Sequence, residues 1–197
     1  MASSALEAWQ IQRQRRIDEL LAAHAIVGGS GPGRRWDTEQ LNWALTLRVA
    51  GEFQGFARDL HDLAVDHFVT VVARGDDRLS LVLRLQLTEN RTLDRGNATP
   101  GAIGADYRRF GLSLWDALRS ADYRAHLWNR KLELLNEARN AIAHANDAKL
   151  VALRERGYPI KLKTVRRWKD ALDGLAATMD DVVSDYLDSL LGGGRPW

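Results

Sequence analysis

Apolar residues recur every three to four positions along most of this chain, which is the spacing of amphipathic α-helices. The alternation typical of a β-strand does not continue for more than about four residues in any segment. The pattern therefore predicts an all-α fold. The expected helices are residues 5–25, 37–75, 78–89, 107–118, 121–146 and 164–191. For the third of them, the density of leucine and valine leaves a strand open as the alternative.

Two glycine-rich stretches divide the chain. Residues 28–33 read Gly-Gly-Ser-Gly-Pro-Gly, a composition typical of flexible linkers, and three glycines at 192–194 end the last expected helix. Residues 91–104 are rich in glycine, proline and asparagine and are expected to form a loop. The breaks predict four segments: an N-terminal helical extension (1–27), a flexible linker (28–36), a helical bundle (37–191) and a disordered tail (192–197).

Composition excludes several classes of protein. Hydrophobic residues make up 45 % of the 197 residues, enough for the core of one domain. The absence of cysteine excludes a disulfide scaffold, a thiolate zinc site and a cysteine nucleophile, and it fits the reducing cytoplasm. No apolar stretch is long enough to cross a membrane, and no glycine-rich phosphate loop or nucleophile elbow is present. We therefore expect a cytoplasmic protein that contacts no membrane.

Charge is unevenly distributed although the net charge is only +2. Residues 149–169 contain eight basic side chains and one acid, whereas residues 170–188 contain six acids and no base. Such asymmetry is typical of a protein that contacts a polyanion through one patch; a solvated helix surface is the alternative. The candidate contacts are Lys149, Arg154, Arg156, Lys161, Lys163, Arg166 and Arg167.

The helix expected to end near residue 146 carries the candidate chemistry. At about 100° per residue, Asn140, Glu137 and His144 fall on one polar stripe, and Ile142 falls on the opposite, apolar side. Arg139 lies about 140° around from His144, near the edge of the apolar side. His144 therefore faces away from the core of its own helix. A surface histidine at a helix C-terminus is the simplest alternative to a functional role.

The segment Leu134-Leu-Asn-Glu-Ala-Arg-Asn-Ala-Ile-Ala-His144 resembles the HEPN superfamily. The RNA-cleaving members of that superfamily carry arginine, usually asparagine beside it, and histidine four to six residues after the arginine. Arg139, Asn140 and His144 match this signature. The resemblance implies an up-and-down helical bundle of HEPN type, here with an extra N-terminal helix. It also implies a homodimer in which two protomers form a composite active site.

The resemblance further implies a metal-independent endoribonuclease, and the residue types suit that chemistry. RNA supplies its own nucleophile, the 2′-hydroxyl group, and the products would be a 2′,3′-cyclic phosphate and a 5′-hydroxyl. His144 would transfer protons near neutral pH, and Arg139 would stabilise charge on the phosphate. Asn140 would orient the histidine or the phosphate. No metal or other cofactor is implied.

Three further polar residues are candidates for the cleft: Arg48, Glu52 and Glu137. Arg48 and Glu52 flank the apolar stripe of the long helix, and Glu137 shares the face of His144. The alternative for the first two is a helix-surface ion pair at i,i+4 spacing, and for Glu137 a solvated acid.

Three functions remain open from the sequence. The first is the ribonuclease, acting on RNA as a toxin or as an antiviral defence effector beside an inhibitor or sensor protein. The second is a non-catalytic HEPN-like binding or regulatory module that pairs with a partner protein. The third is a helical dimerisation scaffold, indicated by the heptad-like apolar series of the last helix.

Overall fold

The structure, a computed structural model, describes residues 1–28 and 36–197, and all secondary structure in these ranges is helical. The predicted all-α fold is confirmed. Most of the expected linker, residues 29–35, lies outside the described residues. The helices are α1 (Ser4–Ala8), the π-helix η1 (Trp9–Arg13), α2 (Gln14–Gly28), α3 (Trp36–Ala73), α4 (Asp77–Thr88), α5 (Thr92–Arg95), α6 (Pro100–Tyr107), the 3₁₀-helix η2 (Arg108–Phe110), α7 (Leu114–Ala121), α8 (Ala125–Ala143), α9 (Asp147–Glu155) and α10 (Leu162–Leu191).

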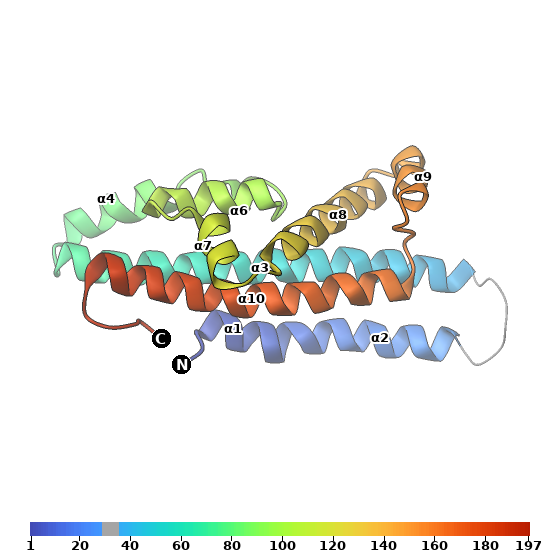
Figure 1. Ribbon diagram of the computed structural model, residues 1–197, viewed down its shortest axis with the longest axis horizontal. Helices are drawn as coiled ribbons and strands as arrows, with labels where there is room; N and C mark the ends of the chain where they lie inside the picture. Colours follow the sequence, from blue (N-terminus) through green and yellow to red (C-terminus); the bar gives the residue numbers. More distant parts are fainter. Residues whose placement is uncertain (29–35) are drawn as a thin grey trace.

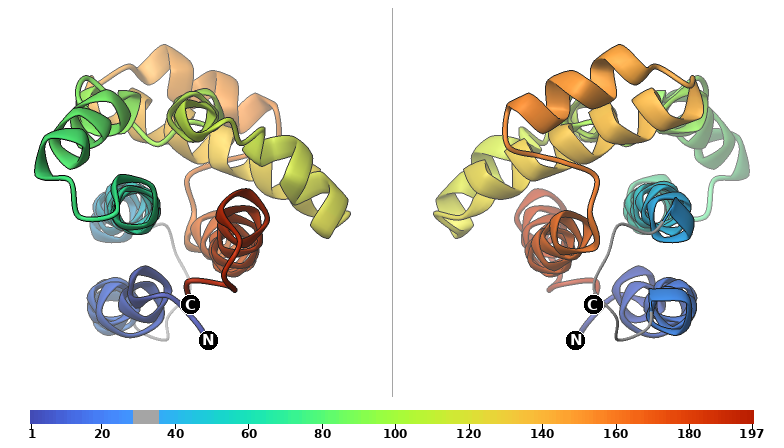
Figure 2. Two further views of the ribbon diagram at one scale, coloured as in Figure 1. Left: turned by 90° about the vertical axis from the view of Figure 1, so that its left-hand side faces the viewer. Right: turned by 90° about the vertical axis from the view of Figure 1, so that its right-hand side faces the viewer.

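The long helix α3 forms the centre of the molecule. It packs against α2, α4, α8 and α10, and α10 packs in addition against α7 and α8. α2 and α8 run one way along the long axis, whereas α3 and α10 run the other way (Figure 1). Seen end-on, α4, α6, α8 and α9 form a layer over α3 and α10 on the side away from α2 (Figure 2).

The N-terminal helices, expected as an extension, contribute to the common core. Trp9 and Ile17 are almost fully buried, and Trp9 packs edge-on against Phe53 of α3 with 5.7 Å between ring centroids. The indole Nε1 of Trp9 also donates a hydrogen bond to Asp173 Oδ1 of α10 at 3.1 Å. The hydrophobic core therefore spans the chain from its first helix to its last.

The last six residues, expected as a disordered tail, fold back along α10. Trp197 is half-buried against the core, and its indole Nε1 donates to the backbone oxygen of Asp180 at 3.3 Å. Ser184 Oγ donates to the backbone oxygen of Trp197 at 3.1 Å. The expectation of disorder is wrong because the indole ring of Trp197 packs on the core and its N–H finds a hydrogen-bond acceptor there.

The segment between α4 and α8 differs most from the expectation. The expected loop 91–104 contains α5 and the start of α6, and the expected helix 107–118 is interrupted at Gly111, whose φ is +84°. The carboxylate of Asp106 accepts hydrogen bonds from the backbone N–H groups of Thr92 and Leu93, both at 2.8 Å. These short helices are therefore set by contacts between residues distant in sequence and not by periodicity.

The close packing of α10 on α8 depends on Gly174. A Cβ atom at position 174 would lie 2.7 Å from Trp128 Cζ2 and 3.0 Å from Trp128 Cε2, and that ring is 5 % exposed. We expect Gly174→Ala to lower the free energy of unfolding by about 2 kcal/mol in urea titrations, because a rigid buried indole must shift. The control is Gly51→Ala in α3, where a Cβ atom would meet nothing within 4 Å. A Gly174→Ala protein as stable as the control would contradict this prediction.

Candidate active site

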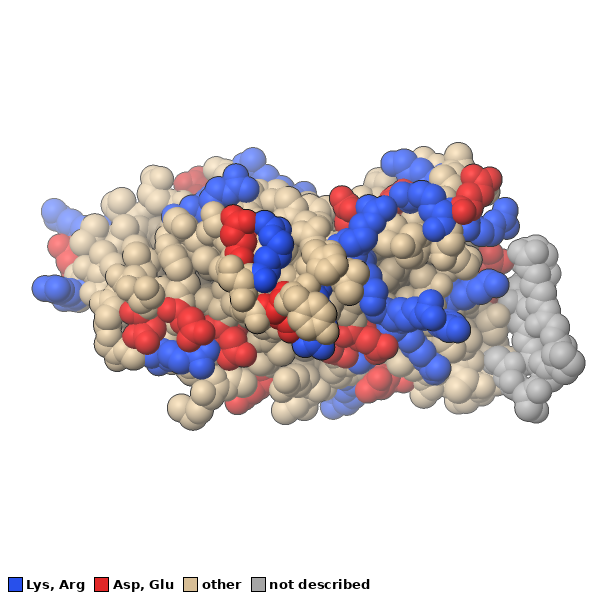
Figure 3. Space-filling model, in the orientation of Figure 1, with Lys and Arg blue, Asp and Glu red and all other residues tan. Residues whose placement is uncertain are grey.

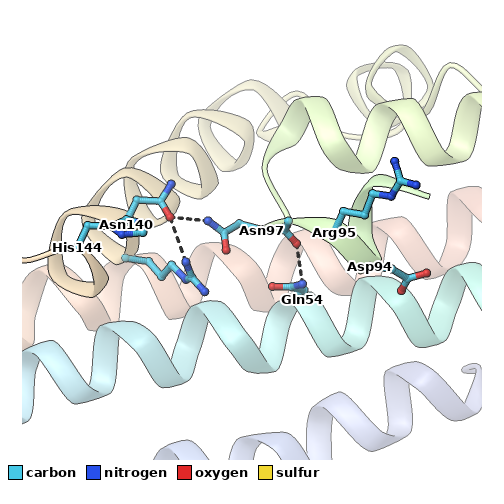
Figure 4. A pocket seen from close by; sticks show the side chains of 8 residues that line it. Gln54, Asp94, Arg95, Asn97, Asn140 and His144 are labelled. Atoms are coloured by element: carbon cyan, nitrogen blue, oxygen red, sulfur yellow. Dashed lines mark hydrogen bonds between the residues drawn. The ribbon is translucent and has the colours of Figure 1, made fainter. Parts of the chain in front are cut away.

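An open, polar pocket of about 400 Å³ lies where α8 faces α3 and the α5–α6 turn (Figure 4). It brings together all three residues of the HEPN-like signature. The pocket is lined by Gln54, Asp94, Arg95, Gly96, Asn97, Arg139, Asn140 and His144.

His144 lies at the C-terminal end of α8, as its C-cap. The next two residues close the helix: Ala145 N–H donates to Ile142 O at 3.2 Å, and Asn146 N–H donates to Ala141 O at 2.8 Å. This pair of bonds is a Schellman motif. Asn146 Oδ1 then accepts from Lys149 N–H at 3.0 Å and caps α9. The backbone at His144 is therefore fixed between the capped end of α8 and the capped start of α9, while its side chain is exposed.

The Schellman motif places Ala145 in the left-handed region, with φ of +47°. Glycine adopts this conformation without the clash that a Cβ atom causes. We expect Ala145→Gly to raise the free energy of unfolding by about 1 kcal/mol. Ala143→Gly, in the last turn of α8, should have the opposite sign because glycine is a poor helix former there. Urea unfolding of both variants checks the prediction, and a loss of stability in Ala145→Gly would contradict it.

Arg139 and Asn140 are both half-buried and contact one another. Arg139 Nη1 donates to Asn140 Oδ1 at 3.1 Å, and Asn97 Nδ2 donates to the same oxygen at 2.5 Å. Asn97 comes from the α5–α6 turn, so the amide of Asn140 is held from two sides (Figure 4). The pocket thus combines a guanidinium, two amides and an imidazole, groups that can bind a phosphate and move a proton.

The α5 wall of the pocket is anchored to α3 by a polar network centred on the buried side chains of Arg91 and His61. Arg91, 5 % exposed, binds the carboxylates of Asp62 and Asp94 and donates to His61 Nδ1 at 3.1 Å. Because a guanidinium can only donate, Nδ1 of His61 must be the acceptor and Nε2 must carry the proton. That N–H faces the backbone oxygen of Asp106 at 3.3 Å. The neutral imidazole is therefore part of the support of the pocket.

Burial, and next the nearby charge of Arg91, lower the pKa of His61 to about 4. An unfolded chain takes up this proton at its ordinary pKa near 6.5. Full stability is therefore present above pH 6.5 and is lost as the pH falls toward 4, by about 3 kcal/mol. The neutral variant His61→Gln should lose less over this range. Urea unfolding of both proteins from pH 7 to pH 4 measures the difference, and equal pH slopes would contradict the prediction.

The three other residues predicted for the cleft lie outside the pocket. Glu52 is buried and binds three arginines: Arg13 at 3.0 Å, Arg16 at 3.1 Å and Arg48 at 3.2 Å. These ion pairs tie η1 and α2 to α3, so the prediction that places Arg48 and Glu52 in the cleft is wrong. The reason is that the N-terminal helices cover this face of α3.

Glu137 points from α8 toward α9 and not into the pocket. Its carboxylate pairs with Arg156 at 2.5 Å. The prediction for Glu137 as a cleft residue is wrong, because the helix that follows the motif supplies an arginine at this position.

The seven basic residues expected to bind RNA are all exposed. They lie on α9, the following loop and the first turns of α10. Figure 3 shows Lys and Arg side chains gathered at this end of the molecule, and Asp and Glu along the C-terminal half of α10. Arg156 is partly engaged by Glu137, and the ion pairs of the described residues include none of the other six.

Sequence reasoning missed the half of the pocket that comes from other elements: Gln54, Asp94, Arg95 and Asn97. Gln54 belongs to α3, where its Nε2 donates to the backbone oxygens of Leu93 at 3.0 Å and of Gly96 at 2.7 Å. No periodicity or motif in the sequence marks these residues. Their role follows only from the packing of the α5–α6 turn against α3 and α8.

Comparison with known proteins assigns no family. No protein-family model matches the chain, and no curated protein or solved structure matches it either. Among the described residues, no helix is both long and apolar enough to span a membrane, and no group of three or more His, Asp or Glu side chains could hold a metal ion.

Proposed function

We propose that this chain is an endoribonuclease of HEPN type that cleaves RNA without a metal ion through the 2′-hydroxyl group. The single observation that carries the proposal is the convergence of Arg139, Asn140 and His144 on one open polar pocket. A histidine at the edge of such a pocket can take a proton from the 2′-hydroxyl or give one to the leaving oxygen. The arginine stabilises the charge that develops on the phosphate.

The surroundings of the pocket support an anionic substrate. Two arginines line it, Arg139 and Arg95, and α9, which follows His144 directly, begins the basic segment. RNA that follows this basic surface would reach the pocket at the α8–α9 junction. A second copy of the chain would bring a second His144 to the same phosphate, as the resemblance implies, and an inhibitor or sensor protein would restrain a toxin or defence effector of this kind.

The test is cleavage of a mixed cellular RNA pool by the purified protein in excess chelator. The expected products carry 2′,3′-cyclic phosphate and 5′-hydroxyl ends, which end-group analysis detects. Sedimentation of the active protein should show a dimer. If a folded dimer cleaves no RNA, the ribonuclease proposal fails and the non-catalytic binding module replaces it.

A further inference from the structure

The α5–α6 turn holds Asn97 at a fixed place in the pocket wall. The backbone oxygen of Gly96 accepts from Gln54 of α3 at 2.7 Å. On the other side of Asn97, the backbone oxygen of Ala98 accepts from Asn136 Nδ2 of α8 at 3.0 Å. Asn136 and Ala98 are 5 % and 2 % exposed, so water does not compete for this second bond. The turn therefore cannot move away from α8 without breaking the buried hydrogen bond between Asn136 and Ala98.

The contacts of Asn140 determine which way its amide points. The atom that meets Arg139 must be the oxygen, because a guanidinium only donates hydrogen bonds. Asn97 Nδ2 donates to that same oxygen at 2.5 Å. The amide nitrogen of Asn140 is therefore turned away from both partners, and none of the described residues accepts a hydrogen bond from it. In Figure 4 both dashed bonds end on the amide oxygen of Asn140 and none ends on its nitrogen.

We propose that Asn97 is a positioning residue that keeps the amide nitrogen of Asn140 facing the substrate. This inference rests on the proposed ribonuclease function. In this orientation, two N–H groups are available to a phosphate oxygen, whose negative charge grows in the transition state. The reverse orientation would present the amide oxygen to an anion. Arg139 alone restrains the amide less firmly, since its long side chain has many rotamers and can follow the amide oxygen to other positions.

Two substitutions of nearly the same shape separate the roles of Asn97. Asn97→Leu removes the donor, and Asn97→Asp replaces the donor with an acceptor that pulls the amide nitrogen of Asn140 toward itself. We expect kcat to fall about 100-fold in Asn97→Leu and at least as far in Asn97→Asp, with KM changed by less than about threefold. The positioning role is overturned if Asn97→Leu keeps its kcat within threefold of wild type.

Asn90→Asp is the matched control for the added negative charge. Asn90 accepts a hydrogen bond from Arg95, another residue of the pocket, and does not contact Asn140. A carboxylate at position 90 would pair with Arg95, so the added charge should weaken RNA binding and raise KM, while kcat should stay within about threefold of wild type. A fall in Asn90→Asp equal to that in Asn97→Asp would assign the loss to charge and overturn the interpretation of that variant.

Hydrogen exchange of side-chain amide protons gives a readout that needs no RNA. In wild type, the Nδ2 protons of Asn140 face solvent and should exchange rapidly in nitrogen-resolved spectra. In Asn97→Asp one of the two should exchange more slowly, because it would bind the new carboxylate. Rapid exchange of both protons in a folded Asn97→Asp protein would overturn the inference. If wild type cleaves no RNA, the ribonuclease proposal fails, whereas this exchange pattern still decides the role of Asn97.

Discussion

Replacing His144 with alanine should slow RNA cleavage by about 100- to 10,000-fold, the usual contribution of a proton-transferring side chain. The loss should appear in kcat, because the imidazole acts in the proton-transfer step and contributes little to binding of the RNA. The fold should be unaffected. The side chain of His144 is exposed, and no described residue forms a hydrogen bond with its imidazole. Single-turnover cleavage and thermal unfolding of the same preparation measure both effects.

His126 provides a matched control on the same helix. It is exposed, lies in the first turn of α8 and, among the described residues, bonds only to the backbone oxygen of Tyr123, at 2.7 Å. His126→Ala removes the same side chain from the far end of α8 and should leave cleavage within about twofold of wild type. Equal loss in both variants would indicate that the activity does not depend on the pocket.

The second large effect is expected at Glu52. Its carboxylate is 5 % exposed and binds Arg13, Arg16 and Arg48, whereas Arg13 itself is 16 % exposed. Glu52→Ala would leave Arg16 and Arg48 without their shared partner and should lower the free energy of unfolding by about 3 kcal/mol. Arg13 keeps its ion pair with Asp59 at 2.5 Å but loses one of its two carboxylate partners, and its guanidinium cannot rehydrate without separating η1 from α3. Urea unfolding measures the change.

An exposed ion pair serves as the control, because removing its carboxylate measures the cost of a lost ion pair without the effect of burial. Asp66 pairs with Arg84, and both side chains are about half exposed, at 56 % and 46 %. Asp66→Ala should cost less than about 1 kcal/mol, because water and salt screen the pair. If Glu52→Ala costs no more than Asp66→Ala, the cluster around Glu52 does not hold the N-terminal helices to α3.

The long helices could be predicted from sequence because their apolar spacing is repeated over many turns. The helix expected over 37–75 is α3, and it ends where Arg74 and Gly75 adopt positive φ. The helix expected over 164–191 is α10, which ends before Gly192. In both cases local chemistry, periodicity and a glycine stop, is sufficient.

The short helices could not be predicted because tertiary contacts form their ends. α5 has four residues, and its first N–H groups bind the carboxylate of Asp106, which lies more than ten residues away. The same limit applies to the faces of α8. Asn136 lies one turn before Asn140 but is buried, because its amide donates to the backbone oxygen of Ala98 from the α5–α6 turn. Periodicity does not reveal which neighbour covers a polar side chain.

The candidate site also has a part that could be predicted from sequence and a part that could not. Arg139, Asn140 and His144 are close in sequence, so one helix predicts their proximity, and they do line one pocket. Asn97 and Gln54 reach that pocket from elements that the sequence does not bring together. The incorrect placement of Arg48 and Glu52 has the same origin, since a core-flanking position on α3 can face either a cleft or another helix.

The most direct test of the proposed mechanism replaces one 2′-hydroxyl group of the RNA with hydrogen. The main cleavage site in a short RNA is first mapped, and the same RNA is then made with a single 2′-deoxy sugar on the 5′ side of the cut. If the 2′-hydroxyl is the nucleophile, wild-type protein in excess chelator will cleave the all-ribose RNA at this site and leave the substituted RNA intact. Cleavage of both RNAs at similar rates would contradict the proposed mechanism.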